Sequence, residues 1–515
     1  MVFFYTRCLS SVHYVRVLVA GAIAATALVF GLDSSSTRAV GDKAARGSSD
    51  PNVIVVMVDD QGMKTFTPKT MPHTFDLAKG GAGTEVRGYA SPPLCCPARA
   101  GFLTGQYPHN HGVRQNDWRF FEEPDNTLPA WLQNAGYETG FAGKYLNGYG
   151  PAPLPAGGWD SWFETMQPTG YFKYAASNQG IVETYGKERK DYSTRVVTKE
   201  SRDFIREAAG GPFFLWTSYF APHARNSKDP HCGKDAPIPL PDDWRDVRNL
   251  RVQLSDSYNE RDVSDKPKRV RRRDPLADNY EQVAEDRIRC TIAAMEEVDS
   301  GVRKIDQTLR KLGIKDDTVI VYISDNGFYF GEHRIDEGKY LPYVEAVRVP
   351  MIVNVPPKFM NGNDVEPIKE PVANIDLAPT ILDLAGAEPC TEGGDCRVMD
   401  GRSIVPLLRG NDADWPDPRP IAMHLKHQCV GYEGVYRGKE SYVEWYGQVK
   451  GDCRTPEREL YDLKKDPGQL ENRLYDDPSN DARADAKRLA ELVDRLMNCS
   501  GIQGRDPQQP GRPFC

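Results

Sequence analysis

The chain has 515 residues, a formal net charge of −8 and a pI of about 5.7. This length predicts one large domain accompanied by a smaller one. The acidic balance gives no global reason for a nucleic-acid partner, which usually demands a basic face, so we expect none, and an anionic ligand must be met by local positive charge.

The first residues have the pattern of an export signal. Arg7, His13 and Arg16 precede the apolar run VLVAGAIAATALVFGL, and a Ser-rich polar stretch follows it. We therefore expect a signal peptide at residues 1–37, a flexible linker at 38–50 and a secreted or extracytoplasmic protein, with no stable membrane insertion once the signal is removed. The alternative is an uncleaved signal anchor that would hold the protein at the membrane.

Export permits disulfide bonds, and the chain has eleven cysteines. Setting aside one in the signal segment and the adjacent pair at 95–96 leaves an even number, which we expect to be paired. These are Cys232, Cys290, Cys390, Cys396, Cys429, Cys453, Cys499 and Cys515. Sequence does not determine the connectivity; the simplest guess is local pairing of Cys390 with Cys396 and of Cys429 with Cys453.

Four continuous apolar runs predict strands of an α/β fold whose sheet is covered on both faces. They are Asn52–Val58, Pro212–Ser218, Thr318–Ile323 and Val349–Val355. Before the third run, apolar residues from Ile288 to Leu312 recur every three or four positions. This period predicts a long helix that Gly313 terminates.

Beyond about residue 400 the pattern becomes that of an antiparallel sheet. PIAMHLKH, GVYRG and SYVEWYG have the character of strands, and Asp481–Met497 that of one amphipathic helix. We therefore expect a large domain at 51–400 and a smaller α+β C-terminal subdomain at 401–515.

Acidic residues directly follow two of the predicted strands. Asp59 and Asp60 come after the first strand, and Asp325 and Asn326 after the third. Ligands of open α/β sheets gather beyond the carboxyl ends of the strands, so both pairs are expected to face one crevice. Their oxygen atoms suit a hard cation such as calcium or magnesium better than zinc. Either pair alone is equally well explained as turn-forming residues.

The segment PPLCCPARAGFLTG, residues 92–105, is the most specific motif. Pro97 suits a first helical turn, so Cys95 is expected just before a helix N-terminus, whose partial positive charge favours an anion. The sequence CCPAR followed by LTG resembles the signature of the type I sulfatases, in which the first cysteine is oxidised to formylglycine. By this resemblance Cys95 is the converted residue and Cys96 a buried thiol.

The resemblance covers most of the chain, from VIVVMVDDQG through GQYPHNHGV, FAGKYLNGYG, SYFAPH and YISDNGFYFGEHR to ELYDLKKDP. It implies an alkaline-phosphatase-like fold, a sulfuric ester hydrolase and a formylglycine-generating enzyme as maturation partner. It further implies one calcium ion held by Asp59, Asp60, Cys95, Asp325 and Asn326. In such enzymes one hydroxyl of the hydrated aldehyde attacks sulfur and the other later expels sulfate, which a serine cannot do.

The family motifs also imply roles for four charged residues. Arg99 is expected to hold the modified residue, and Lys144 and Lys339 to bind sulfate oxygens. His223 is expected to protonate the leaving oxygen.

One position departs from the family pattern. Leu146, followed by Asn147, stands where many members have a histidine two residues after the motif lysine. Asparagine cannot shuttle a proton at neutral pH, so the group that assists sulfate elimination stays open. His109 and His111 either contact substrate or brace their loop.

Two further charged segments have alternative interpretations. KPKRVRRRDP, residues 266–275, is either a basic handle for sulfated glycans or, as we favour, an exposed insertion loop kept soluble by its charge. His333 and Arg334 are candidates to line the pocket.

The sequence favours a sulfatase, and AGKYLNGYG looks more like N-acetylglucosamine 6-sulfatases than simple arylsulfatases. We therefore expect a sulfated glycan or another sulfated small molecule as substrate. The alternatives are an arylsulfatase of broad specificity and a phosphate or phosphonate monoester hydrolase on the same fold. A non-enzymatic glycan-binding protein is disfavoured, because the signature and the expected calcium ligands are intact.

Overall fold

The computed structural model describes residues 50–79, 82–150, 155–229, 231–413, 415–427, 430–447 and 455–515. The expected signal segment, all but the last residue of the expected linker, and both Cys429 and Cys453 lie outside the described residues. None of the helices in these ranges is long and apolar enough to cross a membrane.

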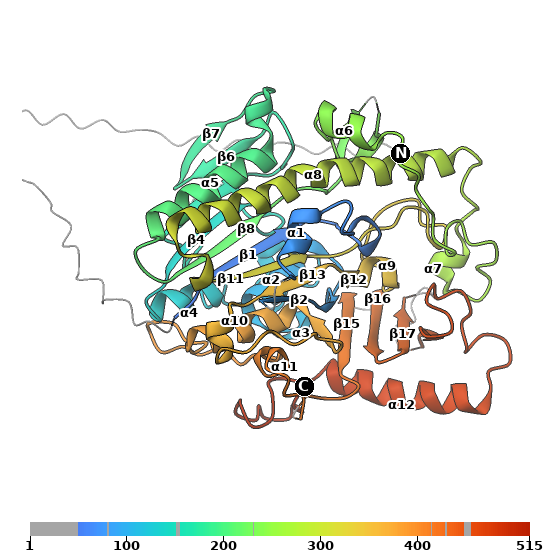
Figure 1. Cartoon of the computed structure of the whole chain (residues 1–515). Coiled ribbons are helices and arrows are strands. Elements are labelled where there is room, and N and C mark those ends of the chain that lie inside the picture. The colour runs from blue at the N-terminus through green and yellow to red at the C-terminus, as the bar shows by residue number, and fades with distance from the viewer. Residues whose placement is uncertain are drawn as a thin grey trace, which may run out of the picture. The chain divides into compact units, whose positions relative to one another are not determined.

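A nine-stranded mixed sheet forms the centre of the fold (Figure 1). In spatial order its strands are β2 (Gly83–Glu85), β13 (Met351–Asn354), β11 (Thr318–Ser324), β1 (Asn52–Val58), β8 (Phe213–Ser218), β4 (Glu138–Gly143), β5 (Ser161–Thr165), β6 (Ala175–Asn178) and β7 (Ile181–Thr184). The strands from β11 to β5 are parallel, and the outer strands are antiparallel to their neighbours. The parallel strands therefore all end at one edge of the sheet.

Both faces of this sheet are covered by helices, as the continuous apolar runs predict. Along β1, Val53, Val55 and Met57 point into one core, and Ile54 and Val56 into the other. The first core includes residues of α2 (Cys95–Thr104), α4 (Leu128–Asn134) and α10 (Leu377–Ala385). The second includes residues of α1 (Pro72–Asp76), α5 (Ser193–Ala208) and α8 (Tyr280–Leu312).

The long predicted helix is confirmed as α8, and it ends at Gly313 with φ 69°. The predicted strand Val349–Val355 is wrong as a single strand. Its first part belongs to β12 (Arg348–Val349), which pairs with β3 (Arg87–Tyr89) in a small sheet that also holds β14 (Pro371–Ala373). The rest is β13, antiparallel to β11. Pro350 separates the two because it has no N–H to continue a ladder.

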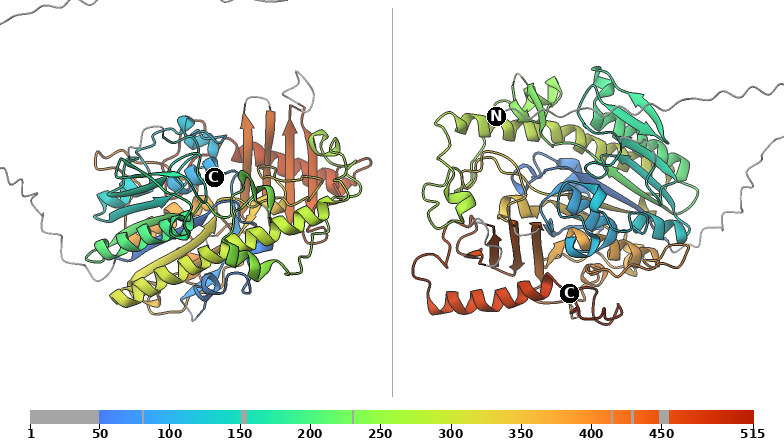
Figure 2. Two further views of the ribbon diagram at one scale, coloured as in Figure 1. Left: turned by 90° about the horizontal axis from the view of Figure 1, so that it is seen from above. Right: turned by 180° about the vertical axis from the view of Figure 1, so that it is seen from behind.

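The C-terminal part contains the expected antiparallel sheet and helix. The strands are β15 (Pro420–His427), β16 (Val430–Arg437), β17 (Glu440–Tyr446) and β18 (Glu457–Asp462). Figure 2 shows α12 (Asn480–Leu496) lying across this sheet. Leu489, Val493 and Leu496 of α12 join the strand residues in one core.

Shorter elements complete the described part of the chain. They are α3 (Pro108–His111), β9 (Arg225–Asp229), β10 (Gly233–Ala236), α6 (Pro241–Val247), α7 (Lys268–Arg271), α9 (Val344–Val347), α11 (Val405–Leu408) and the 3-10 turns Met63–Thr65, Trp118–Phe120, Arg189–Asp191, Lys315–Asp317, Pro357–Met360 and Asn374–Asp376.

Disulfide bonds join Cys232 to Cys290, Cys390 to Cys396 and Cys499 to Cys515. The expected local pair Cys390–Cys396 is thus confirmed. The first bond ties the β9–β10 hairpin to α8, and the last closes the C-terminal tail. Among the described cysteines, those at 95 and 96 are free and buried.

Candidate active site

The two predicted acidic pairs meet at the carboxyl edge of the sheet, because β1 and β11 are parallel neighbours. Asp59, Asp60 and Asp325 are at most 3% exposed. The Asp60 N–H donates to Asp325 Oδ1 at 3.2 Å, and Asn326 Nδ2 donates to Asp60 Oδ1 at 2.6 Å. These bonds hold Asp60 at φ 75°, a left-handed conformation rarely adopted by residues other than glycine. We call these four residues the carboxylate cluster.

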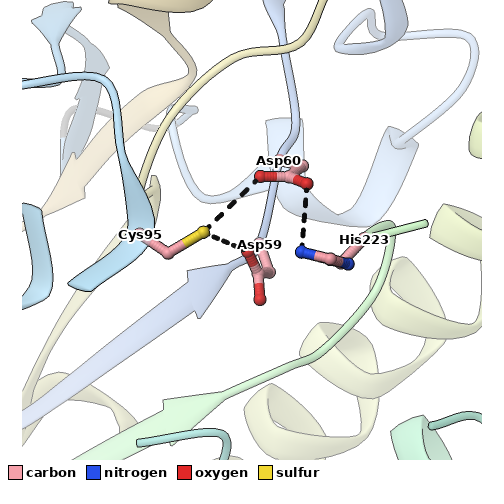
Figure 3. A group of neighbouring side chains, drawn as sticks. All are labelled: Asp59, Asp60, Cys95 and His223. Carbon is pink, nitrogen blue, oxygen red and sulfur yellow. Dashed lines mark hydrogen bonds and ion pairs between the residues drawn. The ribbon is translucent and has the colours of Figure 1, made fainter. Parts of the chain in front are cut away.

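Cys95 faces this cluster (Figure 3). Its thiol donates to Asp59 Oδ1 at 3.3 Å and lies 3.9 Å from Asp60 Oδ1. Helix α2 begins at Cys95 itself rather than after it, which corrects the sequence expectation and places the side chain in the first helical turn. Burial, and then the charge of Asp59, raise the pKa of the thiol well above its usual value, so the thiol is protonated.

Arg99 lies one helical turn after Cys95 and therefore points to the same side of α2. Its fully buried guanidinium donates to Asp325 Oδ2 at 2.8 Å through Nε and to Ser218 Oγ at 2.8 Å through Nη1. Nη1 also donates to the Lys144 carbonyl at 2.6 Å. Nη2 lies 3.6 Å from Asp59 Oδ2 and has no hydrogen-bond partner in the described ranges.

Two lysines reach the carboxylate cluster from different elements. Lys144 follows β4, and its Nζ donates to Asp59 Oδ2. Lys339 lies in the loop after β11, and its Nζ donates to Asp60 Oδ2 at 2.5 Å. Although burial opposes it, Asp59 raises the pKa of Lys144 and Asp60 that of Lys339, so both ammonium groups stay charged.

His223 follows β8 and completes the group drawn in Figure 3. Its Nε2 lies 3.5 Å from Asp60 Oδ2, and its Nδ1 lies 2.6 Å from the Ala224 carbonyl. Burial and the charge of Lys339 lower the pKa of His223 to about 4. The ring is therefore neutral, and the proton on Nδ1 is assigned from the carbonyl that it faces.

The donor set fits a hard cation. One ligand atom each of Asp59, Asp60, Cys95 and His223 lies within 4.8 Å of the others, so this group adds His223 to the expected ligands and does not include Asp325. Asn326 Oδ1 is buried beside the carboxylates and has no partner among the described residues. Carboxylate and amide oxygens together match the preference of calcium or magnesium.

Cys96 is the buried thiol that the resemblance implies, and Leu146 and Asn147, which stand at the position that departs from the family pattern, lie near it. The Cys96 N–H donates to Asn116 Oδ1 at 3.0 Å, and burial raises the pKa of the Cys96 thiol to about 12. Leu146 is 1% exposed and belongs to the core. Asn147 Oδ1 is buried without a partner in the part of the chain described.

The histidines of the PHNHG motif brace their loop. His109 Nε2 lies 2.9 Å from the Cys499 carbonyl, and His111 is fully buried. His333 is also fully buried, with Nδ1 2.7 Å from Glu260 Oε2, so it is part of the packing. Arg334 donates to the Glu260 carbonyl at 2.9 Å.

The favoured interpretation of the basic segment at 266–275 holds in part, because Arg269, Arg271 and Arg272 are exposed but Lys266 is buried. Lys266 is 1% exposed and pairs with Glu260 at 3.0 Å and Asp265 at 2.9 Å. Arg271 pairs with Glu457 of β18 at 2.9 Å. These basic side chains are therefore neutralised within the fold.

Sequence reasoning missed two contributors to the site. Ser218 accepts from Arg99 and donates to the Lys144 carbonyl at 2.6 Å. It is the last residue of a predicted strand, and that position is the signal that would have found it. Strand β4, which places Lys144, is short and contains two glycines, so its pattern does not stand out.

Comparison with known proteins gives a consistent result. The family model described as sulfatase matches residues 51–387, and the model of the N-sulphoglucosamine sulphohydrolase C-terminal region matches residues 331–498. Human N-acetylglucosamine-6-sulfatase is 32% identical in an alignment that covers 91% of this chain and 89% of that protein. The extracellular sulfatase SULF-1 homolog of Drosophila melanogaster is 31% identical over 71% of this chain, but the match spans only 32% of the relative's length.

Solved structures share the fold. A protein in complex with its substrate D-glucosamine-2-N,6-O-disulfate has a TM-score of 0.67 at 21% identity, covering 86% of this chain and 97% of that chain. The phosphonate monoester hydrolase of Agrobacterium radiobacter has a TM-score of 0.64 at 18% identity, covering 87% and 95%. The expected alkaline-phosphatase-like fold, with its smaller C-terminal sheet, is confirmed. The chain belongs to the sulfatase family.

Proposed function

We propose that this protein is a formylglycine-dependent sulfatase that hydrolyses sulfate esters of sulfated carbohydrate. The observation that carries the proposal is the position of Cys95. Its Sγ lies 3.3 Å from Asp59 Oδ1, in the first turn of α2, and Lys144 and Lys339 bind the same carboxylate cluster. An anionic ester placed there would meet two ammonium groups and a helix N-terminus.

Residue 95 as formylglycine would supply a hydrated aldehyde whose hydroxyl is a nucleophile toward sulfur. The burial of Cys95 bears on how that form arises, because a fully buried side chain is closed to a second enzyme. We therefore expect the formylglycine-generating enzyme to act before the chain folds. Arg99 would hold the modified residue through Nη2, which makes no hydrogen bond to any described residue.

A calcium ion is the cation that we assign to the carboxylate cluster. Asp59, Asp60, Asp325 and Asn326, together with residue 95, would hold it. The bound ion would supply positive charge that makes a hydroxyl more acidic and stabilises an anionic sulfate. The support is the all-oxygen donor set of the four side chains and the unpartnered Oδ1 of Asn326 within the described ranges.

Lys144 and Lys339 are the proposed sulfate-binding residues. They approach the cluster on different carboxylates, Asp59 and Asp60, so two cations flank the same place. His223 is the proposed proton donor to the leaving oxygen. In the neutral ring the proton on Nδ1 faces the Ala224 carbonyl and Nε2 carries none, so His223 would donate from Nε2 only after taking up a second proton, which Asp60, 3.5 Å away, would stabilise.

Because the family histidine is absent at position 146, other groups must carry out the proton transfers. Leu146 lies in the core and Asn147 has no titratable group. Lys144, Lys339 and His223 are therefore the candidates to assist sulfate elimination.

A glycan substrate is supported by the relatives. The human relative is an N-acetylglucosamine-6-sulfatase, and one structural neighbour was solved with a disulfated glucosamine. Export is supported by the disulfide bonds and by the extracellular sulfatases among the relatives.

One assay tests this function. Protein made with a formylglycine-generating enzyme is given nitrophenyl sulfate, nitrophenyl phosphate and a glycan ending in glucosamine 6-sulfate, and kcat/KM is measured for each. We expect the sugar sulfate to be turned over and the activity to vanish in Cys95→Ser. If only the aryl sulfate is turned over and a broad panel of sugar sulfates is inert, the protein is an arylsulfatase and the glycan assignment is wrong. Preference for the phosphate ester would replace the proposal by phosphomonoester hydrolysis.

A further inference from the structure

A pocket of about 450 Å³ lies away from the carboxylate cluster. Its walls come from α10, α11, the segments between and after these two helices, and the C-terminal tail, and Figure 1 shows α11 beside the end of the chain. Met399 of the pocket lies against Gly105, the residue that ends α2. Cys95 is at the other end of this ten-residue helix, which rises by about 15 Å. The pocket is therefore separate from the active site.

An indole ring forms a flat wall of this pocket. Trp415 is half-buried, and the guanidinium of Arg419 stacks on it at 4.9 Å from the ring centroid. Arg419 is itself fixed by an ion pair with the buried Asp376, to which its Nη2 donates at 2.6 Å. The ring is thus held in place, and its Nε1–H has no acceptor in the described part of the chain. A fixed aromatic face suits a sugar ring, whereas the indole N–H is buried and is not needed for this contact.

Arg402 is the unpaired cation of the pocket. It is half-buried, and among the described residues its guanidinium makes no hydrogen bond or ion pair; only its backbone N–H bonds to Asp376 Oδ1, at 2.9 Å. Burial and the charge of Arg419 lower the pKa of Arg402, as expected where positive charge is not neutralised. The other arginine of the pocket, Arg505, pairs with Asp506 at 2.7 Å. A planar guanidinium without a partner suits a sulfate or a carboxylate.

The carboxylates of the pocket do not neutralise Arg402. Asp383 accepts a hydrogen bond from Ser403 Oγ at 2.5 Å, and Asp506 is paired with Arg505. Glu388 is exposed at the rim. Among the described lining residues, Arg402 is therefore the cation without a partner, while Asp383 and Glu388 carry negative charge at the exposed rim.

The irregular walls are cross-linked. The Cys390–Cys396 disulfide follows Pro389 of one wall, and the Cys499–Cys515 disulfide closes the tail that carries Ile502 of another. Walls fixed in this way reduce the conformational entropy lost on binding. The pocket also has the volume usual for a site that takes a small ligand.

We propose that this pocket is a second, non-catalytic site for an anionic sugar unit, with its acidic group on Arg402 and its ring on Trp415. The choice of a sugar rests on the proposed function, because a polymeric sulfated substrate could occupy both sites at once. Binding at two places on one chain raises the effective concentration at the active site.

The test measures ligand binding at the pocket through the ¹⁹F resonance of Trp415. The protein has eight tryptophans, so Cys95→Ala protein is labelled with fluorotryptophan and the ¹⁹F resonance of Trp415 is assigned with Trp415→Phe. The probe is a sulfated glucosamine–uronic acid hexasaccharide. We expect a saturable shift of the Trp415 resonance, and no shift with a neutral hexasaccharide. Its desulfated form retains the carboxylates, so equal binding would identify the carboxylate as the group held, and lost binding the sulfate.

Arg402→Gln is the decisive variant. It should weaken the binding seen at Trp415 by about tenfold or more, as expected for loss of one charge-assisted contact. The matched control is Arg251→Gln, because Arg251 is an exposed arginine outside both the pocket and the basic segment at 266–275. A Trp415 resonance that does not move, or that moves with equal affinity in Arg402→Gln, overturns the proposal.

Activity separates this inference from the proposed function. In formylglycine-containing protein, Arg402→Gln should raise KM for the polymeric sulfate several-fold and leave kcat and KM for nitrophenyl sulfate unchanged. If no sulfate ester is hydrolysed but the Trp415 resonance still responds through Arg402, the binding site stands and the proposed function fails.

Discussion

Removing Arg99 tests the charge balance of the carboxylate cluster. The guanidinium is fully buried and donates to Asp325 Oδ2 at 2.8 Å. In Arg99→Met the apolar side chain fills much of the space, but the Asp325 carboxylate loses its ion pair in a place without solvent. Loss of one partner from a buried pair costs about 3–5 kcal/mol.

Proton uptake limits this cost near neutral pH. Burial and Asp59 raise the pKa of Asp325 to about 7, and loss of Arg99 raises it further, so the carboxyl group can become neutral. We therefore expect about 3 kcal/mol at pH 7, the lower end of the range.

The deficit should then grow with pH. A carboxyl group that is protonated in the folded protein and ionised in the unfolded chain binds an extra proton on folding, so stability falls as pH rises. In wild type the stability lost as pH rises is lost by about pH 7, where Asp325 ionises in the folded protein. In the variant the folded pKa is higher, so stability continues to fall above about pH 7. The limiting slope is about 1.4 kcal/mol per pH unit.

Calorimetry in metal-free buffer measures the effect. For the unit from Ala45 to Cys515, the entropy of unfolding is roughly 1 kcal/mol/K, so a loss of about 3 kcal/mol lowers Tm by about 3 °C at pH 7. The deficit should be larger at pH 8.5. Asp325→Asn combined with Arg99→Met should recover part of the loss, because both charges are then gone.

Arg397→Met is the matched control. The Arg397 side chain is also buried, but it donates to Gln106 Oε1 at 2.7 Å and to backbone carbonyls, and its ion-pair partner Glu123 has a side chain that is 68% exposed. Its deficit should not grow above pH 7. If Arg99→Met stays within about 1 °C of wild type at both pH values, the buried-pair argument is wrong.

Three further outcomes are expected. Chelation with EDTA should abolish sulfate release and calcium should restore it, whereas zinc with no calcium or magnesium requirement would contradict the assigned cation. Cys95→Ser should keep Tm within about 1 °C, because the replacement is nearly isosteric, but it should lose turnover. Peptide mass spectrometry should find an aldehyde at residue 95 of active wild type, and an unmodified thiol there would refute the mechanism. Replacing both cysteines of the Cys232–Cys290 bond should cost about 4 kcal/mol by calorimetry and those of Cys390–Cys396 about 2 kcal/mol, because the loops closed span 58 and 6 residues; the reverse order would show that loop entropy does not set the difference.

The sequence alone determined the main strands, the long helix and the position of the acidic pairs. β1 and β11 were predictable because a strand buried on both faces must be apolar at every position. α8 was predictable from its period and from Gly313, whose left-handed φ of 69° ends the helix. Asp59 and Asp325 follow directly from those strands, and Cys95 stands in a motif specific enough to indicate the family.

Only the tertiary structure decided which charges meet. Arg99 and Asp325 are 226 residues apart, and Lys339 and Asp60 are 279 apart, so no local pattern pairs them. Lys266 shows the same limit. In the sequence it belongs to a basic run typical of an exposed loop, yet ion pairs with Glu260 and Asp265 allow it to be buried.

The pocket beyond the end of α2 shows the difference most clearly. Arg402 stands in the segment DGRSIVPLLRG, whose pattern does not indicate a pocket, and Trp415 has no motif around it. The two gain their arrangement when the C-terminal tail folds back beside α10 and α11. Local propensity and periodicity depend on neighbours within a few residues, whereas the charge and shape of a cavity depend on segments joined only by the folded chain.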